Sequence, residues 1–425
     1  MGRLEEQDFD EKRLARRQRR KKSQLFAFII LISVVVVIAA VCAFGVHTVS
    51  KYLGEKKVQD EEAAAIASSE YENNVIETPE EVTEPVEMSE SDVLEEIVNG
   101  CVSELSLEDK VAGLFMVTPE QLTGVPTVVK AGSSTQDALS KYSVGGIVYS
   151  AKNIKSQDQI TEMIKSTQDM SKYPIFTALR EDGSSEGAIS SSVGGIDAVE
   201  INSSDSAYIT GTSIAANMFK YGFNFDIAPE IDLSENSRYG NDVTAVSDIV
   251  SSFTNSLGDS GVFSCLYAFP AKVEGTSSAM AASEMTKEEL ASGNFSVYKN
   301  AISSGKVSAV MMSNGSFPGY IGDNTPASLS NIAIDELRSN MGYEGVIVTG
   351  PLDEGAITQY YTSAEAAVDA IAAGADIIYL PENFEEAYQG VLDAVSSGKI
   401  TEERIDESIK RIYRLKYSDK INEIK

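Results

Sequence analysis

The segment YEGVIVTGPLDEGAI contains acidic side chains just past a predicted buried strand. The apolar, β-branched run 345–349 predicts the strand, and Gly350-Pro351 ends it because proline has no N–H to donate within a central sheet. Folds built from parallel strands place chemistry at the residues that follow a strand's carboxyl end. Gly350 and Pro351 can neither carry a proton nor attack a carbon atom, whereas the carboxyl groups of Asp353 and Glu354 can act as proton donors or nucleophiles.

A second acidic pair, Glu181 and Asp182, follows the apolar run YPIFTAL (173–179). If the fold brings carboxyl groups from the two segments together, one can donate a proton while the other attacks. The formal net charge is −29, so solvated loop charge is the competing interpretation of all these acids.

The composition excludes several classes of function. A chain with this much negative charge is not expected to bind nucleic acid, because binding of the phosphate backbone requires a basic protein surface. The single histidine, His47, leaves the rest of the chain without a histidine base, acid or metal ligand. The cysteines are Cys42, Cys101 and Cys265, and no two have metal-ligand spacing. We therefore predict no metal, no cofactor and no disulfide framework, leaving open only an isolated Cys101–Cys265 pair.

Alternating apolar runs and amphipathic stretches predict the elements that must position these acids. Eight runs predict strands: 113–117, 145–150, 173–179, 223–229, 262–269, 308–314, 345–349 and 375–380. The stretches between them with helical periodicity include 157–172, 206–221, 244–258, 364–373 and 384–396. This alternation predicts an α/β fold, a TIM-like (β/α)8 barrel. A doubly wound open sheet is the alternative, but no Gly-x-Gly-x-x-Gly follows the first strand to support it.

The N-terminal segments predict a membrane anchor. A basic cytoplasmic tail (1–24) precedes an uncharged apolar stretch (25–46) that is long enough for a single transmembrane helix. The basic flank predicts a cytoplasmic N-terminus and an extracellular body at the cell membrane. A cleaved signal peptide is the alternative. Cys42 resembles a lipoprotein site, but Val41 before it is bulkier than such sites normally tolerate.

Residues 47–96 are rich in glutamate, poor in large apolar residues and interrupted by Pro79 and Pro85. Such a composition cannot bury a core and predicts a disordered, acidic extracellular linker. The barrel is then expected over 97–417, with a short C-terminal tail at 418–425.

Five ordered blocks of this sequence resemble one family. They are LSLEDKVAGLFMV (105–117), SVGGIVYSAKNIKSQDQI (143–160), GFNFDIAPEIDLSEN (222–236), PASLSNIAIDELRSNMGYEGVIVT (326–349), and 367–416 with its segments AVDAIAAGADIIYLP and AVSSGKITEERIDESIKRIYRLK. They resemble the N-terminal catalytic barrel of glycoside hydrolase family 3, in the subgroup of single-domain bacterial β-N-acetylglucosaminidases. The resemblance implies the barrel fold and the hydrolysis of terminal β-linked N-acetylhexosamine.

The catalytic positions depart from the family pattern. The family's nucleophilic aspartate follows a strand ending in Val-Ile-Thr, and here Thr349 and Leu352 match while Gly350 stands at the nucleophile's position. The subgroup's acid/base is a loop histidine, which this body lacks. A family Lys-His-Phe-Pro-Gly-His motif corresponds to LYAFPAKVEG, where Tyr267 and Ala268 replace the lysine and histidine.

The family's substrate-binding positions survive in part. The motif Asp-x-Glu-Gly-Gly corresponds to LREDG, with Leu179 in place of the aspartate while Glu181 remains. Asp232 and Arg238 also match, so the resemblance implies substrate binding by Arg238, Glu181 and Asp232.

These observations lead to three hypotheses. The first is a membrane-anchored, catalytically inactive barrel that binds cell-wall glycan or a surface protein. The second is an active β-N-acetylhexosaminidase with Asp353 or Glu354 as nucleophile and Glu181 or Asp182 as acid, which requires carboxyl groups about 5 Å apart for retention or about 6.5–9.5 Å for inversion. The third is a structural domain whose barrel mouth is filled by side chains such as Tyr267 and Leu179.

Overall fold

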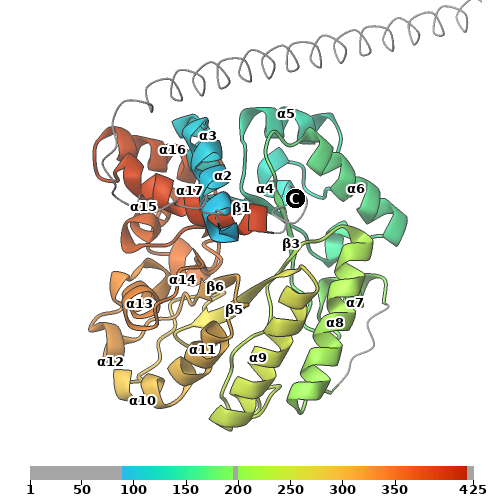
Figure 1. Ribbon diagram of the computed structural model, residues 1–425. Coiled ribbons are helices and arrows are strands. Elements are labelled where there is room, and N and C mark those ends of the chain that lie inside the picture. The colour runs from blue at the N-terminus through green and yellow to red at the C-terminus, as the bar shows by residue number, and fades with distance from the viewer. Residues whose placement is uncertain (1–88, 195–199, 419–425) are drawn as a thin grey trace, which may run out of the picture. The chain divides into compact units, whose positions relative to one another are not determined.

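A parallel sheet of eight strands forms the centre of the computed structural model, which describes residues 89–194 and 200–418 (Figure 1). The strands are β1 Phe115–Val117, β2 Gly146–Val148, β3 Phe176–Leu179, β4 Phe225–Asp226, β5 Phe263–Phe269, β6 Ala309–Met312, β7 Val346–Val348 and β8 Ile378–Tyr379. Their order is β7-β6-β5-β4-β3-β2-β1-β8. A parallel bridge between Val348 and Ile377 joins β7 to the residue before β8, so the sheet closes on itself. The predicted (β/α)8 barrel is confirmed.

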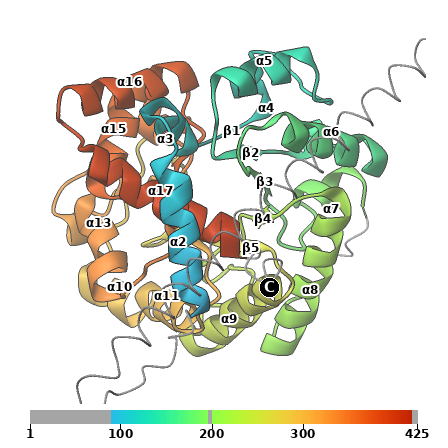
Figure 2. The ribbon, with the colours of Figure 1, turned by 45° about the horizontal axis from the view of Figure 1, so that its top comes forward.

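Helices surround this sheet and join its strands (Figures 1 and 2). The helices of eight or more residues are α2 Glu90–Ser103, α5 Ser133–Lys141, α6 Gln157–Met170, α8 Ser204–Tyr221, α9 Val243–Asp259, α11 Asn294–Ser303, α15 Ser363–Ala373, α16 Phe384–Ser396 and α17 Glu402–Tyr417. The shorter ones are α3 Leu107–Gly113, α4 Pro119–Thr123, α7 Ala188–Ser192, α10 Lys287–Ser292, α12 Pro318–Ile321, α13 Asn331–Asp335 and α14 Gly355–Thr358. Every predicted strand and helical stretch coincides with one of these elements.

The barrel interior is packed with aromatic side chains. The ring of Phe176, which begins β3, lies 5.1 Å from that of Phe225 and 5.7 Å from that of Phe263, measured between centroids. Gly146 in β2 is required by this packing, since a Cβ there would lie 2.8 Å from Met116. The barrel is therefore a filled core whose two ends differ in chemistry.

The predicted boundary of the linker at residue 96 is wrong, because α2 already begins at Glu90. Ser89 and Asp92 form a capping box that satisfies backbone N–H groups at the start of the helix. Val98 is fully buried, and Glu95 forms an ion pair with Arg414 of α17. Figure 2 shows α2 alongside α17.

The predicted basic tail (1–24), transmembrane helix (25–46) and nearly all of the linker lie outside the described residues. Within 89–194 and 200–418, no helix combines the length and apolar character needed to cross a membrane.

Candidate functional site

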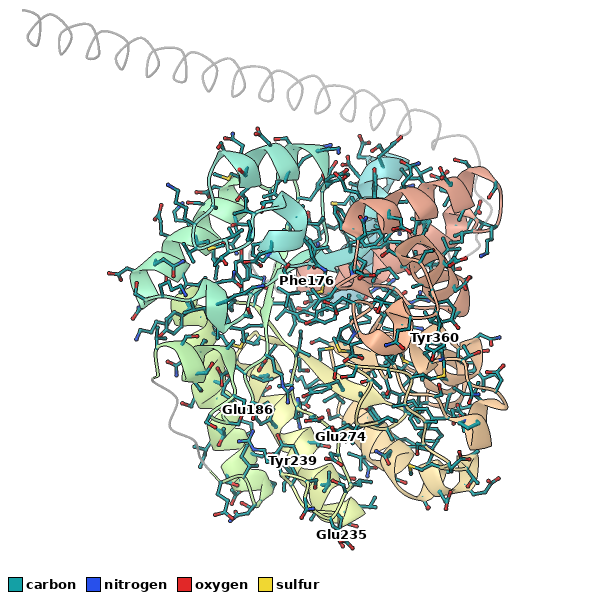
Figure 3. The ribbon with its side chains drawn as sticks, turned by 180° about the vertical axis from the view of Figure 1, so that it is seen from behind. Phe176, Glu186, Glu235, Tyr239, Glu274 and Tyr360 are labelled. Carbon is teal, nitrogen blue, oxygen red and sulfur yellow. The ribbon has the colours of Figure 1, made fainter. Side chains whose placement is uncertain are left out.

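A cavity of about 340 Å³ lies at the carboxyl ends of the barrel strands. The residues that line it belong to β5, β6 and β8 or follow β3 to β7. They include Arg180, Glu230, Tyr267, Lys272, Glu274, Asn314, Pro351, Glu354 and Tyr379. In Figure 3, Glu274 lies well away from Phe176, which begins β3 at the other end of the barrel. The cavity therefore occupies the end of the barrel at which the sequence predicted chemistry.

Gly350, which the sequence resemblance places at the nucleophile's position, has no room for a side chain. A Cβ on this buried glycine would lie 2.6 Å from Oδ1 and 2.9 Å from Nδ2 of Asn314. Real Cβ atoms do not approach other heavy atoms so closely. Asn314 follows β6 and therefore fills the space beside the end of β7.

A hydrogen-bond network holds Asn314 in this position. Its Nδ2 donates to the carbonyl oxygen of Pro351 at 2.7 Å and to Oε2 of Glu354 at 2.8 Å. The hydroxyl group of Ser328 donates to its Oδ1 at 2.7 Å and accepts from the N–H of Gly350 at 2.8 Å. Buried polar groups that are satisfied in this way resist rearrangement. The filled position is thus part of a specific local structure.

The two carboxyl groups predicted beyond β7 occupy different places. Glu354 lines the cavity and forms the N-cap residue of α14. Asp353 is exposed and does not line the cavity. Of the two predicted replacement nucleophiles, only Glu354 can meet a ligand there.

Glu181 is fully buried and its carboxyl group is occupied. Oε2 accepts from the N–H groups of Ile189 at 2.9 Å and Ser190 at 3.1 Å, and Oε1 accepts from the Ser190 hydroxyl at 2.9 Å. A Cβ on Gly187 would lie 1.8 Å from Oε1, so this glycine allows the close approach. Burial raises the pKa of Glu181 despite these hydrogen bonds. Glu181 fixes the start of α7 and does not line the cavity.

Asp182, Asp232 and Arg238 gather in a smaller neighbouring cavity of about 190 Å³. Nη1 of Arg238 lies 3.2 Å from Oδ1 of Asp182. Burial acts to raise the pKa of Asp182, but hydrogen bonds from Ser184 and the nearby guanidinium groups hold it below its usual value. A carboxyl group that is ionised and paired is a poor general acid. The residues that the resemblance assigns to substrate binding are thus divided between this cavity and the buried site of Glu181.

Two cations in the main cavity were not predicted. Nη2 of Arg180 lies 3.3 Å from Oε2 of Glu230, and its guanidinium group lies 4.9 Å from the centroid of the Tyr267 ring. Nζ of Lys272 lies 3.2 Å from Oε1 of Glu230 and 2.8 Å from Glu274. The signal in the sequence was their position: Arg180 directly follows the predicted strand 173–179, and Lys272 lies three residues beyond the predicted strand 262–269.

Within the ranges that the structure describes, no group of three His, Cys, Asp or Glu side chains is arranged to hold a metal ion. The cavity instead offers hydrogen-bonding side chains beside the rings of Tyr267 and Tyr379. Aromatic faces with a few polar groups are typical of sites that bind small ligands.

Comparison with known proteins identifies a matching family. The profile of the glycosyl hydrolase family 3 N terminal domain matches residues 106–415. β-Hexosaminidase A of Pseudoalteromonas piscicida is 22% identical over 326 residues, which cover 66% of this chain and 54% of that protein. β-Hexosaminidase LpqI of Mycobacterium tuberculosis is 24% identical over 341 residues, which cover 73% of this chain and 83% of that protein.

Solved structures agree with the observed fold. A glycoside hydrolase family 3 β-N-acetylglucosaminidase from Paenibacillus sp. str. FPU-7 superposes with a TM-score of 0.69 at 26% identity, covering 75% of this chain and 63% of that chain. LpqI of Mycobacterium tuberculosis superposes with a TM-score of 0.64 at 22% identity, covering 75% and 96% of the two chains. The matched region thus spans about half of β-hexosaminidase A and under two thirds of the Paenibacillus enzyme.

Proposed function

The chain belongs to glycosyl hydrolase family 3. We propose that its barrel binds a glycan containing β-linked N-acetylhexosamine without hydrolysing it. Relatives named β-hexosaminidase support this class of glycan. The observation that carries the proposal is the Asn314 side chain in the space beside Gly350. A retaining glycosidase needs a carboxylate at the anomeric carbon, and this position holds neither the carboxylate nor room for one.

The missing acid supports the same proposal. The chain's single histidine, His47, lies outside the matched region 106–415. General acid–base catalysis contributes about 10²–10⁴-fold to a rate, so its loss together with the nucleophile leaves little hydrolysis. Binding has different requirements, and the cavity keeps aromatic faces and charged groups that can contact sugar hydroxyls.

The proposed location is the outer face of the cell membrane, with residues 25–46 as the anchor. The uncharged apolar length of that segment and its basic flank support this location. Fractionation of cells that express the full chain tests it: we expect the protein in the membrane fraction, accessible to protease from outside. Recovery of a shortened, soluble chain would instead indicate a cleaved signal peptide.

The first experiment measures hydrolysis and binding by the same full-length protein. We expect no turnover of an aryl β-N-acetylglucosaminide and measurable binding of chitooligosaccharides by titration calorimetry. Tyr267→Ala removes the ring beneath Arg180 and should weaken binding about tenfold, since a good aromatic contact is worth on the order of 1 kcal/mol or more. Tyr360→Ala, at a tyrosine that is 56% exposed and outside the cavity, is the matched control (Figure 3).

An active hydrolase is the second candidate, because Glu230 and Glu354 are among the carboxyl groups that line this cavity. Turnover that disappears in Glu354→Gln and Glu230→Gln would establish this function and overturn the first. If neither hydrolysis nor glycan binding is detected, a surface protein becomes the expected partner.

A further inference from the structure

The opposite end of the barrel contains a cavity with an unusual lysine. The cavity has a volume of about 450 Å³ and lies between the end of α6, the beginning of β3 and the end of α17. Its lining combines aromatic rings with a few polar groups and includes Lys172, Tyr173, Phe176, Asn224, Phe263 and Lys416. This volume lies in the range of small-molecule sites.

Lys416 is 92% buried, with a relative exposure of 8%. Among the described residues, no carboxylate lies within ion-pair distance of its Nζ, and no hydrogen-bond acceptor contacts it. Its neighbours are the faces of two rings, with Nζ 4.9 Å from the centroid of Phe176 and 5.6 Å from that of Tyr413. Buried ammonium groups are normally paired, because an isolated charge in an apolar environment is costly.

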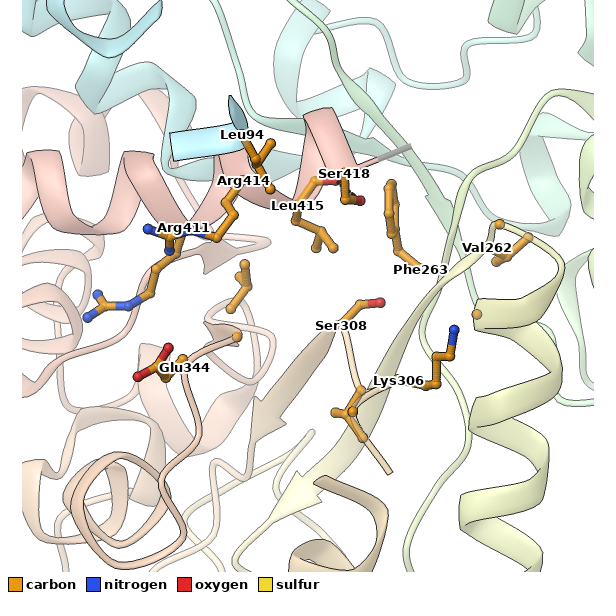
Figure 4. A pocket seen from close by; sticks show the side chains of 16 residues that line it. Leu94, Val262, Phe263, Lys306, Ser308, Glu344, Arg411, Arg414, Leu415 and Ser418 are labelled. Atoms are coloured by element: carbon orange, nitrogen blue, oxygen red, sulfur yellow. Dashed lines mark hydrogen bonds between the residues drawn. The ribbon is translucent and has the colours of Figure 1, made fainter. Parts of the chain in front are cut away.

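A neighbouring cavity shows that this arrangement is specific to Lys416. Phe263 and Gly261 also line a cavity of about 360 Å³ between α17 and the beginnings of β5 to β7 (Figure 4). The cations in that cavity are all paired: Arg411 with Asp376 at 3.2 Å, Lys306 with Asp259 at 3.4 Å, and Arg414 with Glu95. A ligand would have to displace a carboxylate there, whereas Lys416 has no carboxylate partner among residues 89–194 and 200–418 and contacts only the two rings.

We propose that Lys416 is a nucleophilic amine that forms a Schiff base with small aromatic aldehydes entering this cavity. The lone pair of Nζ attacks the carbonyl carbon, the carbonyl π electrons move to oxygen, and a proton passes from nitrogen to that oxygen through water. The carbinolamine then loses water to give the imine, so no oxidant or reductant takes part. Phe176 and Phe263 provide apolar surface for the aromatic ring.

Two further groups favour this reaction. Asn224 also lines the cavity, and its side-chain oxygen accepts from the N–H of Thr177 at 2.8 Å, so its amide nitrogen is the group that can donate to a ligand oxygen there. Burial lowers the pKa of Lys416 to about 7, so a large fraction of the amine is uncharged at neutral pH. The titratable groups around it are Lys172, which pairs with Asp109 at 2.8 Å, and the phenols of Tyr173 and Tyr413.

The test is reductive trapping with benzaldehyde and sodium cyanoborohydride on the full chain, followed by peptide mass spectrometry. At pH 7 we expect Lys416 to be modified at least tenfold faster than Lys130 and Lys299, which are exposed and do not line this cavity. The rate at Lys416 should level off above pH 7, where its amine is already uncharged. Lys299→Met, at an exposed lysine outside this cavity, retains Lys416 and is the matched control, which should leave the labelling at Lys416 in place.

Equal or slower modification of Lys416 relative to Lys130 would overturn the proposal. So would rapid labelling of Lys416 only under conditions that unfold the chain, because the reactivity would then not come from the cavity. Circular dichroism of the same samples distinguishes these outcomes.

Discussion

The amide group of Asn314 occupies the space into which a side chain on Gly350 would extend. The two residues follow neighbouring strands, β6 and β7, and Ser328 bridges them by donating to Asn314 and accepting from Gly350. The lack of a side chain at Gly350 and the placement of Asn314 are therefore one structural feature. Introducing an aspartate at this position requires Asn314 to move.

We expect Gly350→Asp to lower the free energy of unfolding by about 2–4 kcal/mol, because it overpacks a buried position and adds an unpaired charge. Adding Asn314→Ala should recover part of this loss, giving a favourable coupling energy of about 1 kcal/mol or more in a double-mutant cycle. Urea unfolding of the four proteins measures this coupling. Additive effects would show that the side chains do not compete for the same space.

Glu181 provides a second prediction, about the loop that follows β3. Glu181→Ala removes the acceptors of the Ile189 and Ser190 N–H groups and should destabilise the fold by roughly 2–4 kcal/mol. Hydrogen exchange should accelerate at residues 187–192. Glu186→Ala, at an exposed residue of the same loop, should change neither quantity (Figure 3). Unchanged exchange in the Glu181 variant would mean that its carboxyl group does not hold α7.

The beginning of α2 gives a third prediction. A fragment that begins at residue 97 lacks the capping box of Ser89 and Asp92 and the ion pair between Glu95 and Arg414. It should unfold at a temperature several degrees below that of a fragment beginning at residue 87, because caps and helix packing each contribute about 1 kcal/mol. Equal melting temperatures would show that the first half of α2 adds nothing to the barrel's stability.

The barrel was predictable because each strand is a short apolar run that the parallel sheet buries on both faces. The beginning of α2 was missed because glutamates surround its apolar residues, Leu94 and Val98, and resemble the linker before them. The signal that could have corrected the boundary was the cap at Ser89, with Asp92 as the third residue after it.

The sequence predicted a site residue correctly only where the role of that residue follows from its position at the end of its own strand. The absence of a carboxylate at Gly350 can be read from the sequence, but its filling by Asn314 depends on a contact between residues far apart in the chain. Glu181 resembled a ligand-binding acid because nothing local shows that its carboxyl group turns toward α7. Arg180 and Lys272 meet at Glu230 only because the barrel brings three strand ends together.

The buried lysine leads to a prediction about pH. The pKa of Lys416 is lowered by burial from 10.5 to about 7 in the folded chain. Between these two values the unfolded chain binds a proton that the folded chain does not, so this group makes the fold more stable as pH rises from about 7 to 10.5. Below about pH 7 both the folded and the unfolded chain carry the charge on Lys416, so the full free-energy cost of burying that charge lowers the stability of the fold.

Lys416→Met keeps the apolar stem and removes the amine, so it should raise the free energy of unfolding at pH 7 by about 2–5 kcal/mol. The gain over the unmodified chain should shrink toward pH 10, because the unfolded chain then loses its proton as well. Urea unfolding at several pH values gives both curves. Lys172→Met is the control, and it should destabilise the fold slightly because it breaks the ion pair with Asp109. A constant difference between the Lys416→Met variant and the unmodified chain across this range would show that Lys416 is charged in the folded protein, and would also remove the basis for its reactivity.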